Sequence, residues 1–399
     1  MLGFAGVLLS VHAIGARSVR LIYALCIGEN VYMRNKYVKG FALAVAAVLG
    51  LAACGGGSDT ATTEPATDIK VAVVYIGTPG DAGWTYQHDQ GIAELEAALG
   101  ITVTRLENIP EGAVATATFD KLARDGYNII FGTSFGYMDP MLETAGKYPD
   151  VCFQHNSGYK TAPNMGTYFG AGYEGFYLSG IAAGAASPSG KIGMVAAFPI
   201  PEVISSVNAY ALGARSVNPN ATVQVTWTST WYDPAKEKLA AQSLLQVGVD
   251  VVGMYQDSTA TGEAAKEAGA KWTGNDSDTK AGDFPDTWLT GSVWEWGSYY
   301  TRATESMIAG TCLTDQFYGN MADGTVRLGV LGSSVSEEAR SLIADKQAAI
   351  IDGSFAPFTG PINDNTGKEQ IAAGAAASLP DILGMMYLVE GVIGEIPKG

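Results

Sequence analysis

The residues best suited to chemistry in this chain are aromatic and short polar side chains that follow predicted β-strands. In chain order they are Asp81, Trp84, Ser134, Phe135, Phe198, Trp231, Asp257 and Asn275. Open parallel sheets bind their ligands beyond the carboxyl ends of the strands. Rings that stack, combined with carboxylate and amide groups that read an edge, predict a pocket for a flat heterocycle or a sugar.

Within this set the expected roles differ. Trp84 follows a glycine-rich loop and would supply a stacking face, and Trp231 would form a further pocket wall. Ser134, Asp257 and Asn275 would read the ligand's polar edge. Two structural alternatives stay open, because Trp84 could pack on its own sheet and Asp257 could cap the helix that follows it.

Enzymatic chemistry finds little support in the motifs. The run from Gly132 to Gly136 fits the G-x-S-x-G pattern around Ser134, but the downstream histidine, His155, comes too soon for an α/β-hydrolase. Each Gly-Lys pair lacks the Ser or Thr of a phosphate loop. His88 is expected on the solvent face of the first helix. The histidine and cysteine usage also argues against a metal site, so we expect neither catalysis nor a cofactor.

The elements that must position these residues alternate in type from residue 69 onward. Short β-branched runs are separated by longer amphipathic stretches, which is typical of parallel strands joined by crossover helices. The first series has strands at 70–76, 101–107, 128–132 and 151–155 with helices at 84–99, 115–125 and 138–147. A second series begins with a helix at 173–186. The pattern predicts an α/β protein with two doubly wound parallel-sheet lobes joined by a multi-segment hinge.

The division between the lobes is expected to be discontinuous. We assign residues 69–169 plus about 296–350 to the N-terminal lobe, and residues 170–295 plus about 351–399 to the second lobe. The hinge is expected at 169–172 and 295–297, where glycine-containing stretches change lobe.

The N-terminal region reads as an export signal. Residues 33–53 combine a basic start, a short apolar core and small residues before Cys54, which is typical of a lipoprotein signal peptide with Cys54 as the lipidated residue. Residues 54–68 form a flexible polar tether. Residues 1–32 fit no part of this plan and suggest a mis-assigned start.

Charge and cysteine content limit the partners. The 24 basic and 40 acidic residues give a net charge of −16, which argues against nucleic acid or an anionic membrane surface as a ligand. Cys152 lies in an apolar run that predicts a buried strand, and its spacing from Cys312 leaves open whether the two pair.

The loops together resemble one family. Five motifs are similar to those of the BMP, or PnrA-like, substrate-binding lipoproteins of ABC importers: Gly80-Asp81-Ala82-Gly83-Trp84-Thr85, Thr133-Ser134-Phe135-Gly136, Phe198-Pro199-Ile200-Pro201-Glu202-Val203-Ile204, Trp231-Tyr232-Asp233-Pro234 and Phe358-Thr359-Gly360-Pro361-Ile362. The similarity extends from Lys70 to about Gly394, in the same order.

The resemblance implies a type I periplasmic-binding fold and a purine base or nucleoside ligand held between rings of the two lobes. By motif, the rings would be Trp84 and Phe198, and Asp139 falls where many relatives have Asp. Thr85 replaces a frequent Asn, which removes one amide and favours a free base such as adenine over a nucleoside.

The expected protein is therefore a monomeric, lipid-anchored, periplasm-facing binder in the bacterial cell envelope. It would deliver its ligand to an ABC permease and ATPase. Two alternatives remain, a sensory receptor subunit for the same ligand and a type I sugar-binding protein.

Overall fold

A computed structural model describes residues 69–397, so the predicted start, signal peptide, Cys54 and tether lie outside the described residues. The first sheet has six parallel strands in the order β11-β5-β4-β3-β1-β2. They are β1 (Val71–Val74), β2 (Val103–Leu106), β3 (Ile129–Gly132), β4 (Cys152–Asn156), β5 (Met165–Gly170) and β11 (Gln316–Gly319). Four of them, β1, β3, β4 and β5, are buried along their whole length, as expected for parallel strands covered on both faces.

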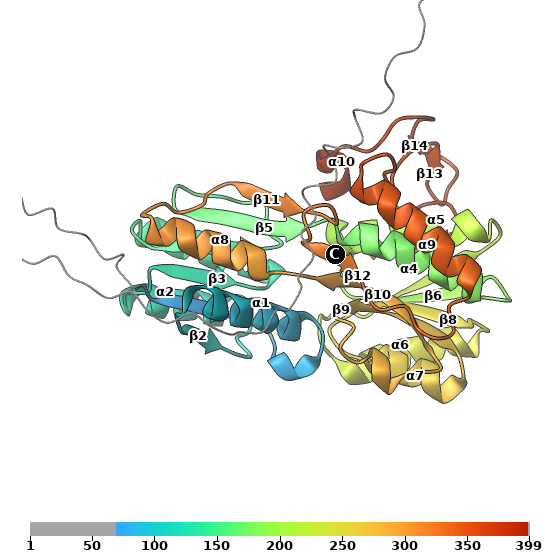
Figure 1. Cartoon of the computed structure of the whole chain (residues 1–399), viewed down its shortest axis with the longest axis horizontal. Helices are drawn as coiled ribbons and strands as arrows, with labels where there is room; N and C mark the ends of the chain where they lie inside the picture. Colours follow the sequence, from blue (N-terminus) through green and yellow to red (C-terminus); the bar gives the residue numbers. More distant parts are fainter. Residues whose placement is uncertain (1–68, 398–399) are drawn as a thin grey trace, which may run out of the picture. The chain divides into compact units, whose positions relative to one another are not determined.

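Helices cover both faces of this sheet (Figure 1). They are α1 (Trp84–Leu99) and α8 (Gly297–Ile308) on one face, and α2 (Ala113–Arg124) and α3 (Met138–Lys147) on the other. Alternate residues of β1 supply the two cores, because successive strand side chains point to opposite faces. Val71 and Val73 belong to one buried cluster, and Ala72 and Val74 to the other.

The second sheet has seven strands in the order β12-β10-β9-β8-β6-β7-β15, and β12 runs antiparallel to β10. They are β6 (Lys191–Ala196), β7 (Thr222–Trp227), β8 (Val251–Tyr255), β9 (Lys271–Asp276), β10 (Trp288–Trp294), β12 (Val326–Leu328) and β15 (Val392–Ile393). One face carries α4 (Gly172–Ala186), α5 (Pro201–Val217) and α9 (Glu337–Ile351), and the other carries α6 (Pro234–Gln246) and α7 (Ala260–Ala268). This sheet is also doubly wound.

Glycines let α4 and α5 approach very closely. A Cβ at Gly180 would lie 2.1 Å from the Tyr210 carbonyl oxygen, and one at Gly213 would lie 2.0 Å from the Tyr177 carbonyl oxygen. These distances are shorter than any side chain tolerates, so only glycine permits this packing.

Shorter elements complete the chain. Three single-turn helices, η1 (Pro79–Asp81), η2 (Phe135–Tyr137) and η3 (Ala281–Asp283), follow strands, and the C-terminal part holds a hairpin of β13 (Ile362–Asn363) and β14 (Glu369–Ile371) followed by α10 (Leu379–Leu383). The predicted fold class, two doubly wound lobes with a multi-segment hinge, is confirmed.

The chain passes between the sheets three times, and the crossings are hydrogen-bonded to one another. They lie between β5 and α4, between β10 and α8, and between β11 and β12. The Ala171 amide donates to the Gly319 carbonyl at 2.8 Å, and the Glu295 amide donates to the Thr325 carbonyl at 2.9 Å. The first two crossings lie at the stretches where the sequence analysis expected the hinge, 169–172 and 295–297. The third crossing was not predicted.

The lobe boundary near the C-terminus differs from the prediction. We call residues 69–170 and 297–319 the first lobe, and residues 172–294 and 326–397 the second lobe. Only α8 and β11 return to the first sheet, whereas β12 pairs with β10 and α9 packs on α4. The predicted first-lobe segment of about 296–350 therefore ends some 30 residues too late. An amphipathic helix such as α9 fits either sheet, and its pattern carries no information about which one.

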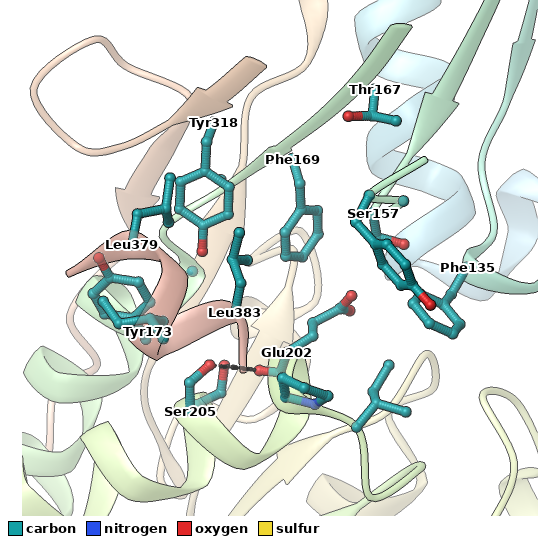
Figure 2. A pocket seen from close by; sticks show the side chains of 18 of the residues that line it. Phe135, Ser157, Thr167, Phe169, Tyr173, Glu202, Ser205, Tyr318, Leu379 and Leu383 are labelled. Carbon is teal, nitrogen blue, oxygen red and sulfur yellow. Dashed lines mark hydrogen bonds between the residues drawn. The ribbon is translucent and has the colours of Figure 1, made fainter. Parts of the chain in front are cut away.

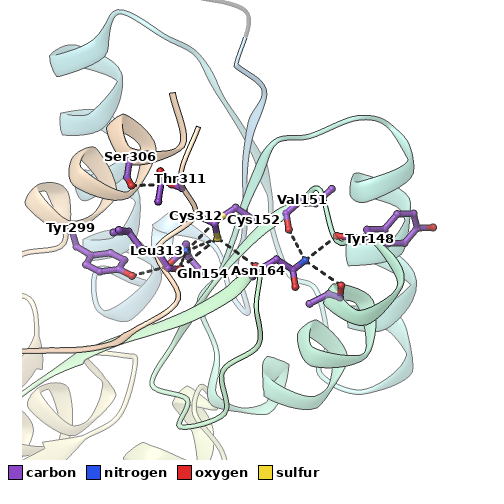
Figure 3. Close-up of a disulfide and its surroundings, with 11 residues drawn as sticks. Tyr148, Val151, Cys152, Gln154, Asn164, Tyr299, Ser306, Thr311, Cys312 and Leu313 are labelled. Carbon is purple, nitrogen blue, oxygen red and sulfur yellow. Dashed lines mark hydrogen bonds between the residues drawn. A yellow bond between two sulfur atoms is a disulfide. The ribbon is translucent and has the colours of Figure 1, made fainter. Parts of the chain in front are cut away.

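A disulfide joins Cys152 on β4 to Cys312, which follows α8, and so ties the returning segment to the first sheet (Figure 3). Gln154 lies beside it, and its amide donates to the Leu313 carbonyl at 2.7 Å. The sequence left this pairing open, because 160 residues separate the two cysteines. Within residues 69–397, no helix has the length and apolar character needed to cross a membrane.

Candidate functional site

A cavity lies where the carboxyl ends of the two sheets face each other, and we call it the central cavity. Ile76, Trp84, Ser134, Phe135 and Ser157 of the first lobe line it together with Glu202, Trp231, Tyr255, Asp257 and Asp276 of the second. These residues end strands, lie in the loops that follow them or begin the next helices, which is where open α/β sheets bind ligands. Two lining residues, Ser157 and Asp276, have positive φ angles of 57° and 64°, a strained state that concentrates at functional sites.

Two further cavities adjoin the central one. The side cavity has a volume of about 170 Å³ and shares Phe135, Ser157, Glu202 and Tyr255 with it. The rim cavity lies on the other side, shares Ile76, Trp231 and Asp257, and also contains Asp81 and Phe198. The three cavities therefore form one continuous series along the junction of the lobes.

The Asp81 side chain caps the start of α1. Its carboxylate accepts hydrogen bonds from the backbone amides of Gly83 at 2.9 Å, Thr85 at 2.8 Å and Tyr86 at 3.0 Å. Burial raises the pKa of Asp81, and these donors oppose that rise. The side chain thus satisfies orphan helix amides and orients Trp84, so its contribution to a ligand site is positional.

Trp84 is almost fully buried and fixed from several sides. Its indole Nε1 donates to the Thr133 carbonyl at 2.7 Å, and its ring packs edge-on against His88 at 4.4 Å and Trp294 at 6.3 Å. His88 is completely buried, stacks on Trp296 and contacts the Tyr300 hydroxyl at 2.6 Å. The expectation that His88 lies on the solvent face of the helix is wrong, since it is one turn from Trp84 on the buried face.

Glycine at position 83 allows the lobes to meet at this point. A Cβ on Gly83 would lie 2.8 Å from the carbonyl oxygen of Asp257 in the second lobe. Any larger residue would therefore push the Trp84 loop away from Asp257.

Ser134 is not arranged as a nucleophile. Its hydroxyl donates to Glu111 Oε1 at 2.6 Å, while His155 Nε2 contacts the Ser134 backbone carbonyl oxygen at 2.8 Å. Burial lowers the pKa of His155 to about 4, which leaves the ring neutral. A nucleophile needs its base at the hydroxyl, and here the histidine contacts the main chain instead.

The second lobe contributes carboxyl groups whose hydrogen-bonding capacity is only partly used within the protein. The Tyr255 hydroxyl donates to Glu202 Oε1 at 2.7 Å, and burial raises the pKa of Glu202 to about 7. At neutral pH this side chain therefore exists both as an acid that donates a proton and as a carboxylate that accepts one.

Asp257 and Asp276 lie close enough to repel each other. Burial is the main cause that raises the pKa of each well above its usual range, and their mutual charge adds to the shift for Asp257. The Trp294 indole donates to Asp276 Oδ1 at 3.0 Å, but Asp276 Oδ2 has no hydrogen-bond partner among the described residues. The pair thus offers hydrogen-bonding groups to whatever fills the cavity.

The rings that reach the central cavity differ partly from those predicted. Trp231 and Phe135 line it with Trp84, whereas Phe198 lies in the rim cavity and contacts Trp231 at a centroid distance of 4.9 Å. A sandwich of Trp84 against Phe198 is therefore not the arrangement in this structure. Phe135 and Trp231, from opposite lobes, line the central cavity instead.

Two predicted residues lie outside all three cavities. Asp139 is on the surface, with 73% of its side chain exposed and an ion pair to Lys160. Asn275 is buried within β9, and its amide has no hydrogen-bond partner in the part of the chain that the structure describes. Its neighbour Asp276 lines the central cavity instead, because adjacent strand residues point to opposite faces.

Sequence reasoning missed Glu202, Tyr255, Ser157 and Asp276. Glu202 belongs to the motif from Phe198 to Ile204, and Asp276 directly follows Asn275, so both were within reach of the sequence but were not chosen as site residues. Within residues 69–397, no group of three or more His, Cys, Asp and Glu side chains is arranged to hold a metal ion.

Two solved structures with a similar fold are solute-binding proteins of ABC transporter systems. One from an ABC transporter system of Aeropyrum pernix K1 has a TM-score of 0.64 at 21% identity, covering 76% of this chain and 94% of that one. Another, from Conexibacter woesei DSM 14684, has a TM-score of 0.60 at 22% identity and covers 72% of this chain and 98% of that one. The fold is that of the type I periplasmic-binding proteins.

The family follows from the sequence match. The profile of the ABC transporter substrate-binding protein PnrA-like family, Bmp, matches residues 68–359, and the chain belongs to this family. The predicted family is thereby confirmed. Members bind a solute outside the cytoplasm and interact with an ABC permease.

Two relatives at higher identity carry different ligand names. A purine-binding protein of Brucella abortus (strain 2308) is 42% identical over 332 residues, which are 83% of this chain and 94% of that protein. A putative ABC transporter glucose-binding protein of Haloferax volcanii is 36% identical over 345 residues, 86% of this chain and 84% of that protein.

Proposed function

We propose that this protein is the substrate-binding lipoprotein of an ABC importer and that it captures a purine base, or a purine nucleoside, in the central cavity. The observation that carries the proposal is the combination of three rings, Trp84, Phe135 and Trp231, with buried carboxyl groups whose pKa values are raised by burial. The purine-binding relative of Brucella abortus supports the same ligand class.

The chemistry of the carboxyl groups suits a purine edge. A neutral carboxylic acid offers one donor and one acceptor side by side, and purine edges present a ring nitrogen beside an N–H group. Glu202, Asp257 and Asp276 each supply this combination when protonated. Stacking on Phe135 or Trp231 would add roughly 1–3 kcal/mol for each ring.

A free base such as adenine is the preferred ligand over a nucleoside. The indole of Trp84 takes more space than a phenyl ring would, and Thr85 offers no amide to a ribose. The Thr85 backbone amide lies at the start of α1, where it donates to the Asp81 carboxylate at 2.8 Å. We expect adenine to bind about tenfold more tightly than adenosine.

Capture itself requires no reaction. Ligand that contacts both lobes stabilises the arrangement in which they meet, and that form docks on the permease while ATP is hydrolysed elsewhere. The three hydrogen-bonded crossings are the segments around which the lobes would move. We propose a monomer that reaches the membrane only through a lipid on Cys54.

A sugar is the second candidate ligand. The Haloferax volcanii relative is named as a putative glucose-binding protein, and carboxylates beside aromatic rings also suit sugar hydroxyls. A receptor subunit that senses the same ligand would share this pocket and would differ only in its membrane partner.

The test is to purify residues 68–399 without denaturation, release bound small molecules by unfolding, and identify them by mass spectrometry. Calorimetry with adenine, adenosine and glucose on refolded protein then ranks the ligands. Adenine binding most tightly supports the proposal. Adenosine binding tenfold more tightly than adenine would overturn the preference for a base, and glucose as the only ligand would overturn the purine assignment.

A further inference from the structure

The side cavity is much more apolar than the central cavity it adjoins. Beyond the shared residues its walls are mostly rings and branched aliphatic side chains. They include Phe169, Tyr173, Tyr318, Leu379, Ile382 and Leu383. Figure 2 shows Phe169 and Tyr318 on one side and Phe135 on another, with the Glu202 carboxylate between Phe169 and Phe135. Glu202 lines both the side cavity and the central cavity. A group that extends past Glu202 would leave the polar site and enter apolar surroundings.

One wall of this cavity comes from a part of the chain beyond the family match. The Bmp profile ends at residue 359, whereas Leu379, Ile382 and Leu383 belong to α10. Leu379 and Leu383 remain 40% and 44% exposed. Two large apolar side chains are thus held beside the cavity by a segment that the family's common part does not include.

The segment that carries α10 is firmly fixed on the second lobe. The fully buried Asn208 of α5 donates to the Tyr387 carbonyl at 2.7 Å and accepts from the Val389 amide at 2.9 Å. The Ser378 and Asp381 side chains cap the start of α10 reciprocally, and β15 adds to the edge of the second sheet at β7. The wall is therefore part of the folded lobe, and its position is set before any ligand arrives.

We propose that the side cavity binds an apolar substituent of the purine, so that the substrate class includes purines carrying an alkyl or aryl group on nitrogen. The proposal rests on the proposed function, because it places the base in the central cavity. The base would contact Glu202 and Asp257, and the substituent would pass Glu202 to lie among Phe169, Tyr318 and α10. Burial of that apolar surface supplies the added affinity.

The experiment measures the affinities of adenine, N6-benzyladenine and 9-benzyladenine by calorimetry on the protein of residues 68–399. The two isomers place the same ring on opposite edges of the base. One isomer is expected to bind about tenfold more tightly than adenine. In the double variant L379S/L383S that advantage should fall by about tenfold while adenine binds as before.

A matched control lies in the same segment. Met386 is 55% exposed and does not line the cavity, so M386S should leave the affinities for all three compounds unchanged. Because Leu379 and Leu383 are both substantially exposed, their replacement leaves the buried Ile382 to hold α10.

The outcomes separate the two proposals. If adenine binds but both benzyl isomers bind no more tightly, or if L379S/L383S leaves the preference intact, the side-cavity proposal is overturned and the purine assignment stands. If none of the purines binds, the proposed function fails and the side-cavity proposal fails with it.

Discussion

In the first lobe, three of the side chains predicted for the site already have partners of their own. Asp81 caps α1, the Trp84 indole donates to Thr133, and Ser134 donates to Glu111. In the second lobe, Asp276 keeps one carboxylate oxygen without a partner among the described residues, and Asp257 and Glu202 have raised pKa values. We therefore propose that the first lobe supplies preformed walls and that the second lobe supplies the groups that hydrogen-bond to the ligand.

The largest expected effect concerns the stability of the first lobe. Replacing Cys152 and Cys312 by alanine should lower the free energy of unfolding by about 5 kcal/mol, because the bond closes a loop with a sequence separation of 160. Guanidinium unfolding of the variant and of the oxidised parent measures this difference.

The same variant tests whether the first lobe contributes only walls to the binding site. Its ligand affinity, measured where the protein is fully folded, should stay close to that of the parent. A large loss of affinity with unchanged stability would mean that the first lobe contributes more than walls.

The next effect concerns a side chain of the second lobe that is proposed to hydrogen-bond to the ligand. Asp257→Ala should weaken adenine binding by about 1–3 kcal/mol, since the polar group it contacts would lose its partner in a buried site. Ser134→Ala is the matched change in the first lobe, and it should leave the affinity nearly unchanged because that hydroxyl already donates to Glu111. Calorimetry on both variants decides, and equal losses would contradict the comparison.

A smaller effect should appear as a pH dependence. Burial raises the pKa of Glu202 to about 7, so the side chain is protonated below that pH and loses its donor as the pH rises through it. Adenine affinity should therefore fall by up to about tenfold between about pH 6 and pH 8. Glu202→Gln keeps a donor and an acceptor at every pH, and its affinity profile should be flatter. If the affinity of the parent protein depended on pH as little as that of the variant, Glu202 would not be a hydrogen-bonding partner of the ligand.

The smallest effect is expected at Asp139. Its side chain is exposed and paired with Lys160, and surface ion pairs contribute at most about 1 kcal/mol to stability. Asp139→Asn should leave both the affinity and the melting temperature nearly unchanged. A tenfold loss of adenine affinity would return this residue to the binding site.

Local patterns predicted most of the fold, because strand and helix periods depend on neighbouring residues. The strand predicted at 128–132 is β3 at Ile129–Gly132, and the helix predicted at 84–99 is α1 at Trp84–Leu99. The lobe to which β12 and α9 belong depends on long-range pairing, which no local period contains. Those elements were assigned to the first lobe and lie in the second.

The site was predicted less well than the fold, for two physical reasons. A strand places adjacent residues on opposite faces, so choosing Asn275 over Asp276 selected the wrong face. The raised pKa of Glu202 arises from its burial in the folded protein, which its own sequence neighbourhood does not reveal. The burial of His88 could have been predicted, because a spacing of four residues places it on the same face of α1 as Trp84.

The three crossings of the hinge also impose an order on assembly. A chain emerges from the ribosome with its N-terminal part first, but the first sheet cannot acquire its edge strand β11, or Cys152 its partner, until residues 297–319 have emerged. Meanwhile the strands β6 to β10 of the second sheet have all been made. The lobe that begins first is thus completed only after the core of the other lobe is available, and neither lobe is encoded as one uninterrupted stretch.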